Sequence, residues 1–298
     1  MIGDLRGTRK HYSIDHLCAA FGYTRQAWYN QIKRSELRVF QEHIVLQRIR
    51  EIRTDLPKTG CIKLHKELNN GFLQTLGLTM GRDAVFDLMR AQGMLVKVKR
   101  KYVRTTNSFH RFKIHPDLVQ RQAANHAEQI WVSDITYLRV GPCFGFLSLV
   151  TDAYSRKIMG YCLCENLKVK GCIQALNKAI KARIYPQRDL IHHSDRGTQY
   201  CCDEYIQYLT KHGLLISMTQ TGSPYDNAIA ERINGILKME FDLGRKFNSF
   251  SQAAACVDQA VANYNNLRLH ASCGYRTPQQ THQREKYEEE KVKSSFEM

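Results

Sequence analysis

Residues 131–138 read WVSDITYL, and they decide the fold because an acidic residue, Asp134, lies in a run that otherwise has the character of a β-strand. Ahead of it, Ile130 and Val132 alternate with their neighbours, and β-branched and aromatic side chains surround it. The pattern predicts a strand. We therefore expect the Asp134 carboxylate to be buried in a sheet or at its end.

A second acidic residue, Asp195, lies in HHSDRGTQY, residues 192–200. It follows the short apolar run Leu190-Ile191 and precedes Arg196-Gly197, a dipeptide at which strands commonly end. The sequence therefore predicts that Asp195 stands at the tip of a strand.

A third acidic residue, Glu231, lies in SPYDNAIAERINGILKMEF, residues 223–241. Ser223-Pro224, followed by Asp226 or Asn227 as the N-cap, signals the start of a helix whose early part is rich in alanine. We therefore expect Glu231 to project from a helix.

The three acids predict one metal site assembled by folding. Sixty residues separate Asp134 from Asp195 and thirty-five separate Asp195 from Glu231, which excludes a local metal-binding loop. Carboxylates brought close together repel and raise one another's pKa, and a divalent cation relieves that repulsion. Hard oxygen ligands with few histidines favour Mg²⁺, or Mn²⁺, over zinc.

Other polar residues compete for this site. Asp152 in TDAYSR is expected to cap a turn, and adjacent His192 and His193 would point to opposite faces of a strand. Lys238 follows Glu231 by seven residues, which returns it to the same helix face two turns on. We expect it to hold a phosphate group, the alternative being an ordinary exposed lysine.

Composition supports a polyanionic partner. The chain has 298 residues, enough for two domains, and a formal net charge of +16, which favours nucleic acid, with a membrane surface or a ribosome as alternatives. The first ten residues are polar and charged and do not resemble a signal peptide, so we expect a cytoplasmic protein. Its ten cysteines are scattered, and we expect most of them to be small buried side chains, the alternative being disulfides or a structural zinc site.

The N-terminal third predicts helices. Residues 13–31 indicate a helix that ends at Phe21-Gly22, a cap at Thr24 and a second helix, which is helix-turn-helix spacing. A second helical unit runs from Gly60 to residue 94, with an apolar stripe of Val85, Leu88 and Met89. Helix-turn-helix spacing indicates that these helices bind DNA. The alternative is a small helical bundle without DNA contact.

A basic segment joins the two halves. Residues 96–113, VKVKRKYVRTTNSFHRFK, contain seven lysines or arginines and no acid, with aromatic residues interleaved. Basic side chains neutralise phosphates and aromatic rings stack on bases, so the segment indicates a DNA-contacting linker, the alternative being a solvated connector. The residues expected on DNA are Lys97, Lys99, Arg100, Lys101 and Arg104.

The order of elements after residue 125 predicts an α/β core with a mixed sheet. Three consecutive antiparallel strands, among them 144–150 and 157–164, precede a helix and the Asp195 strand. A helix, a strand over 214–219 and the Glu231 helix follow. Ser249 and Gln252 form a capping box that opens a last helix through Ala262, after which YNNLRLH departs from helical periodicity.

Five motifs carry a resemblance to a known family. WVSDITYL, LSLVTDAYSRKIMGY, HHSDRGTQY, SPYDNAIAERINGILKME and YNNLRLHASCGYRTPQQ follow one another over roughly residues 125 to 282. In this order they resemble the OrfB-type DDE transposases of bacterial insertion sequences, which are related to retroviral integrases. The resemblance implies a ribonuclease H-like core, two catalytic metal ions, DNA cleavage and joining, and Asp134, Asp195 and Glu231 as the metal-binding triad.

The resemblance and the composition together give an expected organisation. We expect a helical DNA-binding region at 1–95, a basic linker at 96–124, an integrase-type catalytic core at 125–245 and a C-terminal helix and tail at 246–298. The partners would be double-stranded DNA, both transposon ends and target, and further copies of the chain. No sustained heptad precedes residue 13, so an upstream-frame protein that supplies a leucine zipper is a further candidate partner.

Three other functions remain as alternatives. A tyrosine or serine recombinase would need an Arg-His-Arg-Tyr or serine constellation, which does not emerge. A DNA-binding regulator derived from a transposase would have no need of the acidic triad. A ribonuclease H-like nuclease would share the triad, and DNA joining would distinguish it.

Overall fold

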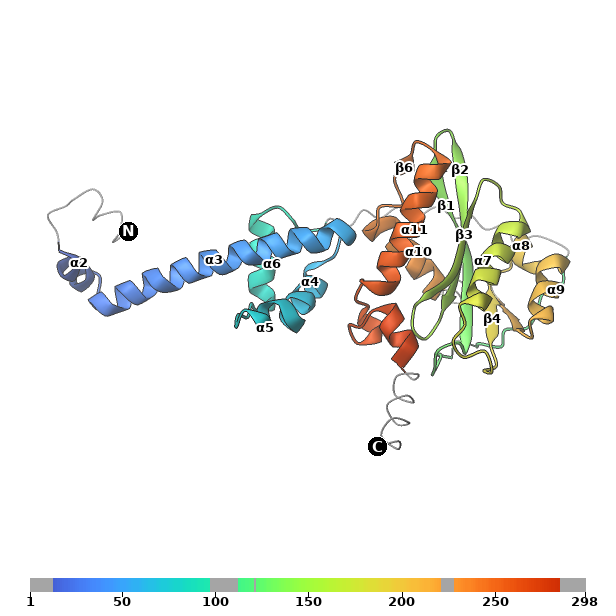
Figure 1. Ribbon diagram of the computed structural model, residues 1–298, viewed down its shortest axis with the longest axis horizontal. Helices are drawn as coiled ribbons and strands as arrows, with labels where there is room; N and C mark the ends of the chain where they lie inside the picture. Colours follow the sequence, from blue (N-terminus) through green and yellow to red (C-terminus); the bar gives the residue numbers. More distant parts are fainter. Residues whose placement is uncertain (1–12, 97–111, 121, 221–227, 285–298) are drawn as a thin grey trace, which may run out of the picture. The chain divides into compact units, whose positions relative to one another are not determined.

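The computed structural model describes residues 13–96, 112–120, 122–220 and 228–284 (Figure 1). They belong to two compact units: one contains the chain up to Thr54 together with Leu64–Leu95, and the other contains Asp55–Lys63 together with the chain from Val96 onward. No described helix is both long and apolar enough to cross a membrane.

The first unit is helical. Its elements, with α4 extending across the boundary between the units, are α2 (Ile14–Ala20), α3 (Arg25–Asp55), α4 (Cys61–Glu67), the π-turn η1 (Leu68–Phe72), α5 (Leu73–Thr75) and α6 (Arg82–Ala91).

The turn between α2 and α3 has the predicted chemistry. Gly22 has a φ of +73°, a left-handed conformation that costs glycine little. Thr24 Oγ1 then accepts a hydrogen bond from the Ala27 N–H at 3.1 Å and caps α3. The predicted stripe of Val85, Leu88 and Met89 on α6 is buried, which confirms it as a core face.

The second unit is an α/β domain. Its strands are β1 (Ile130–Val140), β2 (Cys143–Asp152), β3 (Ile158–Cys164), β4 (Ile191–Ser194), β5 (Leu215–Met218) and β6 (Lys246–Phe247). Its helices are α7 (Val169–Lys181), α8 (Thr198–Cys201), α9 (Asp203–Lys211), α10 (Ala228–Glu240), α11 (Phe250–Asn266) and the 3₁₀ turn η3 (Ala271–Cys273).

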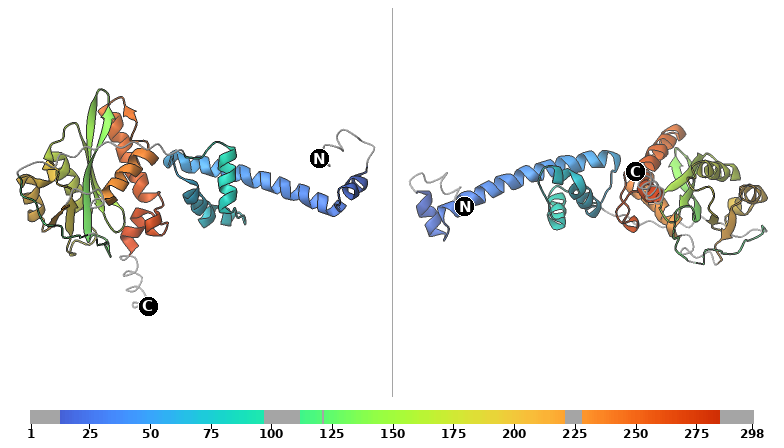
Figure 2. Two further views of the ribbon diagram at one scale, coloured as in Figure 1. Left: turned by 180° about the vertical axis from the view of Figure 1, so that it is seen from behind. Right: turned by 60° about the horizontal axis from the view of Figure 1, so that its bottom comes forward.

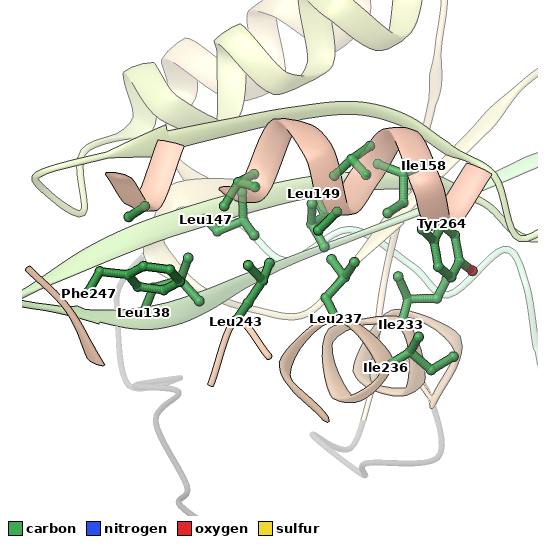
Figure 3. Packing of buried hydrophobic residues seen from close by; sticks show 14 residues of the cluster. Leu138, Leu147, Leu149, Ile158, Ile233, Ile236, Leu237, Leu243, Phe247 and Tyr264 are labelled. Atoms are coloured by element: carbon green, nitrogen blue, oxygen red, sulfur yellow. The ribbon is translucent and has the colours of Figure 1, made fainter. Parts of the chain in front are cut away.

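The sheet is mixed, as predicted. Its order is β3-β2-β1-β4-β5; the first three strands are antiparallel, and β4 and β5 run parallel to β1. Helices cover both faces (Figure 2). Residues of α10 and α11 pack on one face around Leu138, Leu147 and Leu149 (Figure 3), while those of α7 and α9 pack on the other around Trp131.

One edge of β1 has a gap in its pairing. On that side β4 pairs with residues 130–133 and β6 pairs with residues 139–140. Between them, in the described part of the chain, residues 134–138 pair with β2 only. The central strand of the sheet therefore has an open edge at the position of Asp134.

The predicted end of the last helix is wrong. Helix α11 was expected to stop near Ala262, but it continues through Asn266. Packing overrides the loss of apolar periodicity, because Tyr264 is fully buried and its hydroxyl donates to the Arg156 carbonyl at 2.9 Å. Asn265 bonds both the N–H and the carbonyl of Ile158, so the polar residues of this turn bind the β2–β3 connection.

Candidate catalytic site

Folding brings the three predicted acids to the gap in the edge of β1. Asp134 lies within β1 on the α10–α11 side of the sheet, opposite Leu149 of β2. Asp195 is the first residue after β4, whose last residue, Ser194, pairs with Ser133. Glu231 lies in the first turn of α10. The predicted positions in a strand, at a strand tip and on a helix are therefore confirmed.

The three carboxylates lie within electrostatic reach of one another. Burial, followed by the negative charges of Asp195 and then Glu231, raises the pKa of Asp134 to about 7. Hydrogen bonds from the Ile135 N–H, at 2.8 Å, and from Asn234 oppose that rise. Burial and the Asp195 charge likewise raise the pKa of Glu231. Negative charge is therefore crowded at this position.

The donor set suits a hard divalent cation. Carboxylate oxygens are the ligands that Mg²⁺ and Mn²⁺ prefer, and a cation would remove the repulsion that raises the pKa values of Asp134 and Glu231. Within the described ranges, however, no three acidic, histidine or cysteine side chains already converge as a formed metal cluster. The three carboxylates interact electrostatically, but they are not arranged as a formed metal-binding cluster.

Sequence reasoning missed one residue of this site, Asn234. Its Nδ2 donates to Asp134 Oδ2 at 2.7 Å, and its side chain is almost fully buried. Its Oδ1 is buried and has no hydrogen-bond partner in the described part of the chain. The available signal was spacing, because Asn234 follows Glu231 by three residues and precedes Lys238 by four, which places all three on one helix face.

Lys238 is half-buried on this face. Burial lowers its pKa, and the negative charge of Asp134 opposes that shift, so the ammonium group lies within electrostatic reach of the Asp134 carboxylate. The face of α10 directed at the carboxylates thus carries one acid, one amide and one cation.

The competing residues have structural partners instead. Asp152 accepts hydrogen bonds from the N–H and hydroxyl of Ser155, both at 2.7 Å, which confirms it as a turn cap. His192 contacts the hydroxyl of Ser133 and that of Tyr205, and its neighbour His193 contacts Ser217, consistent with their predicted opposite faces.

Two groups of predicted residues lie outside the described ranges. One is the pair of candidate caps, Asp226 and Asn227. The other is the set of linker cations, Lys97, Lys99, Arg100, Lys101 and Arg104.

Comparison with known families identifies the α/β unit as an integrase-type core. Two family descriptions, both "Integrase core domain", match residues 124–224 and 212–278. An IS600 insertion-element protein of 31 kDa from Shigella sonnei is 32% identical over 267 residues, covering 88% of this chain and 96% of that protein. Transposase InsF of IS3A from Escherichia coli is 30% identical over 275 residues, covering 90% and 93%.

Two solved structures are similar in part. The magnesium complex of the HTLV-2 integrase catalytic core domain matches at 18% identity with a TM-score of 0.43, covering 53% of this chain and 98% of that chain. The catalytic domain of the Mos1 mariner transposase matches at 17% identity with a TM-score of 0.40, covering 48% and 74%.

The extent of the matches to curated relatives settles the family. Both of the relatives described above are matched over nearly their whole length. The matched integrase-core region, residues 124–278, also contains every residue of the site at the open edge of β1. The chain belongs to the insertion-sequence transposases, polynucleotidyl transferases with an integrase-type catalytic core.

Proposed function

We propose that Asp134, Asp195 and Glu231 are the catalytic carboxylates of this transposase, that they hold Mg²⁺ (or Mn²⁺), and that the enzyme cuts and joins transposon ends. The observation that carries the proposal is the convergence of these three acids from distant parts of the chain, and the contribution of Asp195 and Glu231 to the raised pKa of Asp134 supports it. These acids come from strand β1, the end of strand β4 and helix α10, and they meet beside the stretch of β1 that pairs with β2 only.

The residues of the candidate site would have different roles in the reaction. When bound, divalent ions would activate a water or a DNA 3′-hydroxyl and stabilise the leaving oxygen in phosphoryl transfer. Asp134, Asp195 and Glu231 would bind the ions, with Asn234 fixing the orientation of the Asp134 carboxylate through its 2.7 Å hydrogen bond. Lys238 would hold a phosphate beside the scissile bond, since a cation on this face attracts the DNA backbone.

The proposed partner is double-stranded DNA, both as transposon ends and as target. We propose that further copies of the chain assemble on that DNA, with an upstream-frame protein as an additional partner. The linker cations Lys97, Lys99, Arg100, Lys101 and Arg104 would contact phosphates. Because the curated relatives belong to bacterial insertion sequences, we propose that the enzyme works in the bacterial cytoplasm at the nucleoid.

Substitution of the carboxylates tests this assignment. Asp134→Asn, Asp195→Asn and Glu231→Gln should each abolish Mg²⁺-dependent cleavage and joining of labelled end oligonucleotides, while the fold, judged by circular dichroism, and DNA binding in Ca²⁺ persist. Glu204→Gln, an exposed acid on α9, is the matched control and should retain activity. Lys238→Ala should weaken crosslinking to the terminal nucleotides more than it weakens overall duplex binding.

Two outcomes would count against the proposal. Strand transfer retained in any of the three carboxylate variants would remove that residue from the triad. Cleavage without joining in the native protein, on every end tested, would favour a nuclease over a transposase.

A further inference from the structure

Three aromatic rings form a cluster on the face of the sheet opposite Asp134. Tyr137 of β1 pairs across the strands with Phe146 of β2, and Arg139 pairs with Phe144, so all four side chains share one face. The Tyr137 ring meets the rings of Phe146 and Phe144 edge to face, with centroids 5.2 and 6.3 Å away. These are favourable aromatic geometries, so the cluster is preformed.

This cluster is open to solvent. Phe144 is 52% exposed, and Tyr137 and Phe146 are only partly buried. The buried cluster beneath α7 and α9 extends along β1 to Ile135 but contains none of the three rings. The helices that cover this face of the sheet therefore leave its aromatic end uncovered.

The cluster also lies beside the candidate catalytic site. Tyr137 belongs to the stretch 134–138 of β1 that pairs with β2 only, so its side chain stands at the open edge that also carries Asp134. Burial raises the pKa of Tyr137, and the negative charges of Asp134 and Asp195 raise it further, so the phenol lies within electrostatic range of both carboxylates.

The charge around the rings suits a nucleic acid. Residues 135–151, which carry the whole cluster, contain no aspartate or glutamate, and their one charged residue is Arg139. The exposed Arg139 lies on the same face as Phe144 and directly opposite it. Aromatic rings beside a cation, with no acid between them, form a surface that takes bases and phosphates together.

We propose that Tyr137, Phe144 and Phe146 form a stacking platform for an unpaired nucleobase next to the phosphodiester that the enzyme cuts. A flat ring reaches the face of a base only when that base is unpaired or terminal, as it is at a cleaved or frayed DNA end. Stacking of this kind tolerates any base, so the platform would position the end without reading its sequence. The inference rests on the proposed catalytic site.

Photocrosslinking tests the platform without requiring turnover. The full-length protein is bound in Ca²⁺ to end duplexes that carry 5-iododeoxyuridine at each of the terminal positions in turn, irradiated and digested. The adduct should map to Tyr137, Phe144 or Phe146. Phe144→Leu, which removes the ring and keeps an apolar side chain, should lower the crosslink yield about fivefold or more, and Phe144→Trp should restore it.

Controls separate the platform from the catalytic assignment and from protein assembly. Leu215→Ala removes another exposed apolar side chain, 49% exposed on β5, and should leave the crosslink unchanged. An adduct elsewhere, or an undiminished yield with Phe144→Leu, would overturn the platform even if the carboxylate variants still lose cleavage. A DNA-free oligomer that dissociates on Phe144→Leu would also overturn it, because the rings would then contact a second copy.

Discussion

The Asp134 carboxylate lies where a bound cation would stabilise its negative charge. Without a metal, that charge destabilises the folded state. Its pKa of about 7 lies above the ordinary value of 3.8, so the folded state favours the protonated carboxyl. An acid whose pKa rises on folding loses stability as the pH rises from its unfolded value through its folded value. The negative charge at this position therefore destabilises the fold at pH 8, and the proposed binding of a cation would offset that destabilisation.

The first prediction follows from the loss of stability that the charged Asp134 causes as the pH rises. At pH 8 without divalent metal, Asp134→Asn should raise the melting temperature, by about 2–4 °C for each kcal/mol of repulsion removed, because the amide imitates the protonated acid. Near pH 4 the difference should vanish. Differential scanning calorimetry across this pH range measures it, with Glu165→Gln, an exposed acid outside the site, as the control.

Adding Mg²⁺ should reverse the order of the two proteins. A ligand that binds only the folded state stabilises it, so the native protein should gain melting temperature and the Asn variant should not. A lower melting temperature for metal-free Asp134→Asn at pH 8 would show that burial of the carboxylate is not a cost.

The sequence predicted the acids of the site but not the amide among them. Asp134, Asp195 and Glu231 stand out because each interrupts a pattern: a strand, a strand end and a helix. Asn234 does not interrupt the helical pattern around it. A lone amide in a helix is most often a solvated residue, so the residue type alone gives no reason to assign it a role. Its role depends on the 2.7 Å hydrogen bond to Asp134, one hundred residues away in the chain, which only the fold creates.

At the scale of elements, local signals predicted the strands and helices and long-range pairing determined the site. Alternation of apolar residues predicted β1, and caps predicted the starts of α3 and α11. The gap in β1 arises because β4 stops at Ser194 and the two-residue strand β6 pairs further along β1. A strand as short as Lys246–Phe247 has no sequence period, so the open edge of β1 beside Asp134 could not be predicted.

The second prediction concerns the packing of α7 on the sheet. A Cβ added at Gly160 of β3 would lie 2.1 Å from the Ala175 carbonyl oxygen and 2.6 Å from the Ala179 nitrogen, both in the backbone of α7. Neither atom can move without displacing the helix, so Gly160→Ala should destabilise the protein by about 3 kcal/mol or more, the upper end for overpacking. Urea denaturation measures the change.

A second glycine provides the matched control for that experiment. Gly235 lies within α10, and a Cβ added there meets no atom within 4 Å. Gly235→Ala should therefore stabilise the protein by roughly 0.5–1 kcal/mol, since alanine loses less backbone entropy in a helix. Equal effects of the two substitutions would mean that close packing of β3 against α7 does not determine the outcome.

At the scale of the whole molecule, the net charge of +16 predicts how strongly DNA binding depends on salt. The candidate catalytic site is crowded with negative charge apart from Lys238, so we expect most of the cations that attract DNA to lie outside it. The densest acid-free run is the segment 96–113, and most of it, from 97 to 111, lies outside the described residues. The contribution of this segment is therefore a matter for binding measurements.

The last prediction addresses that segment directly. Neutralising Lys97, Lys99, Arg100, Lys101 and Arg104 together should flatten the slope of log affinity against log salt, by roughly 0.9 for each duplex phosphate that the protein no longer neutralises. Preference for end DNA over scrambled DNA should survive, because cations on phosphates position a protein without reading bases. Neutralising exposed Lys178, Lys181 and Lys211 on α7 and α9 is the control and should change the slope little. An unaltered slope in the five-site variant would mean that the segment is a connector and that the cations binding DNA belong to other parts of the chain.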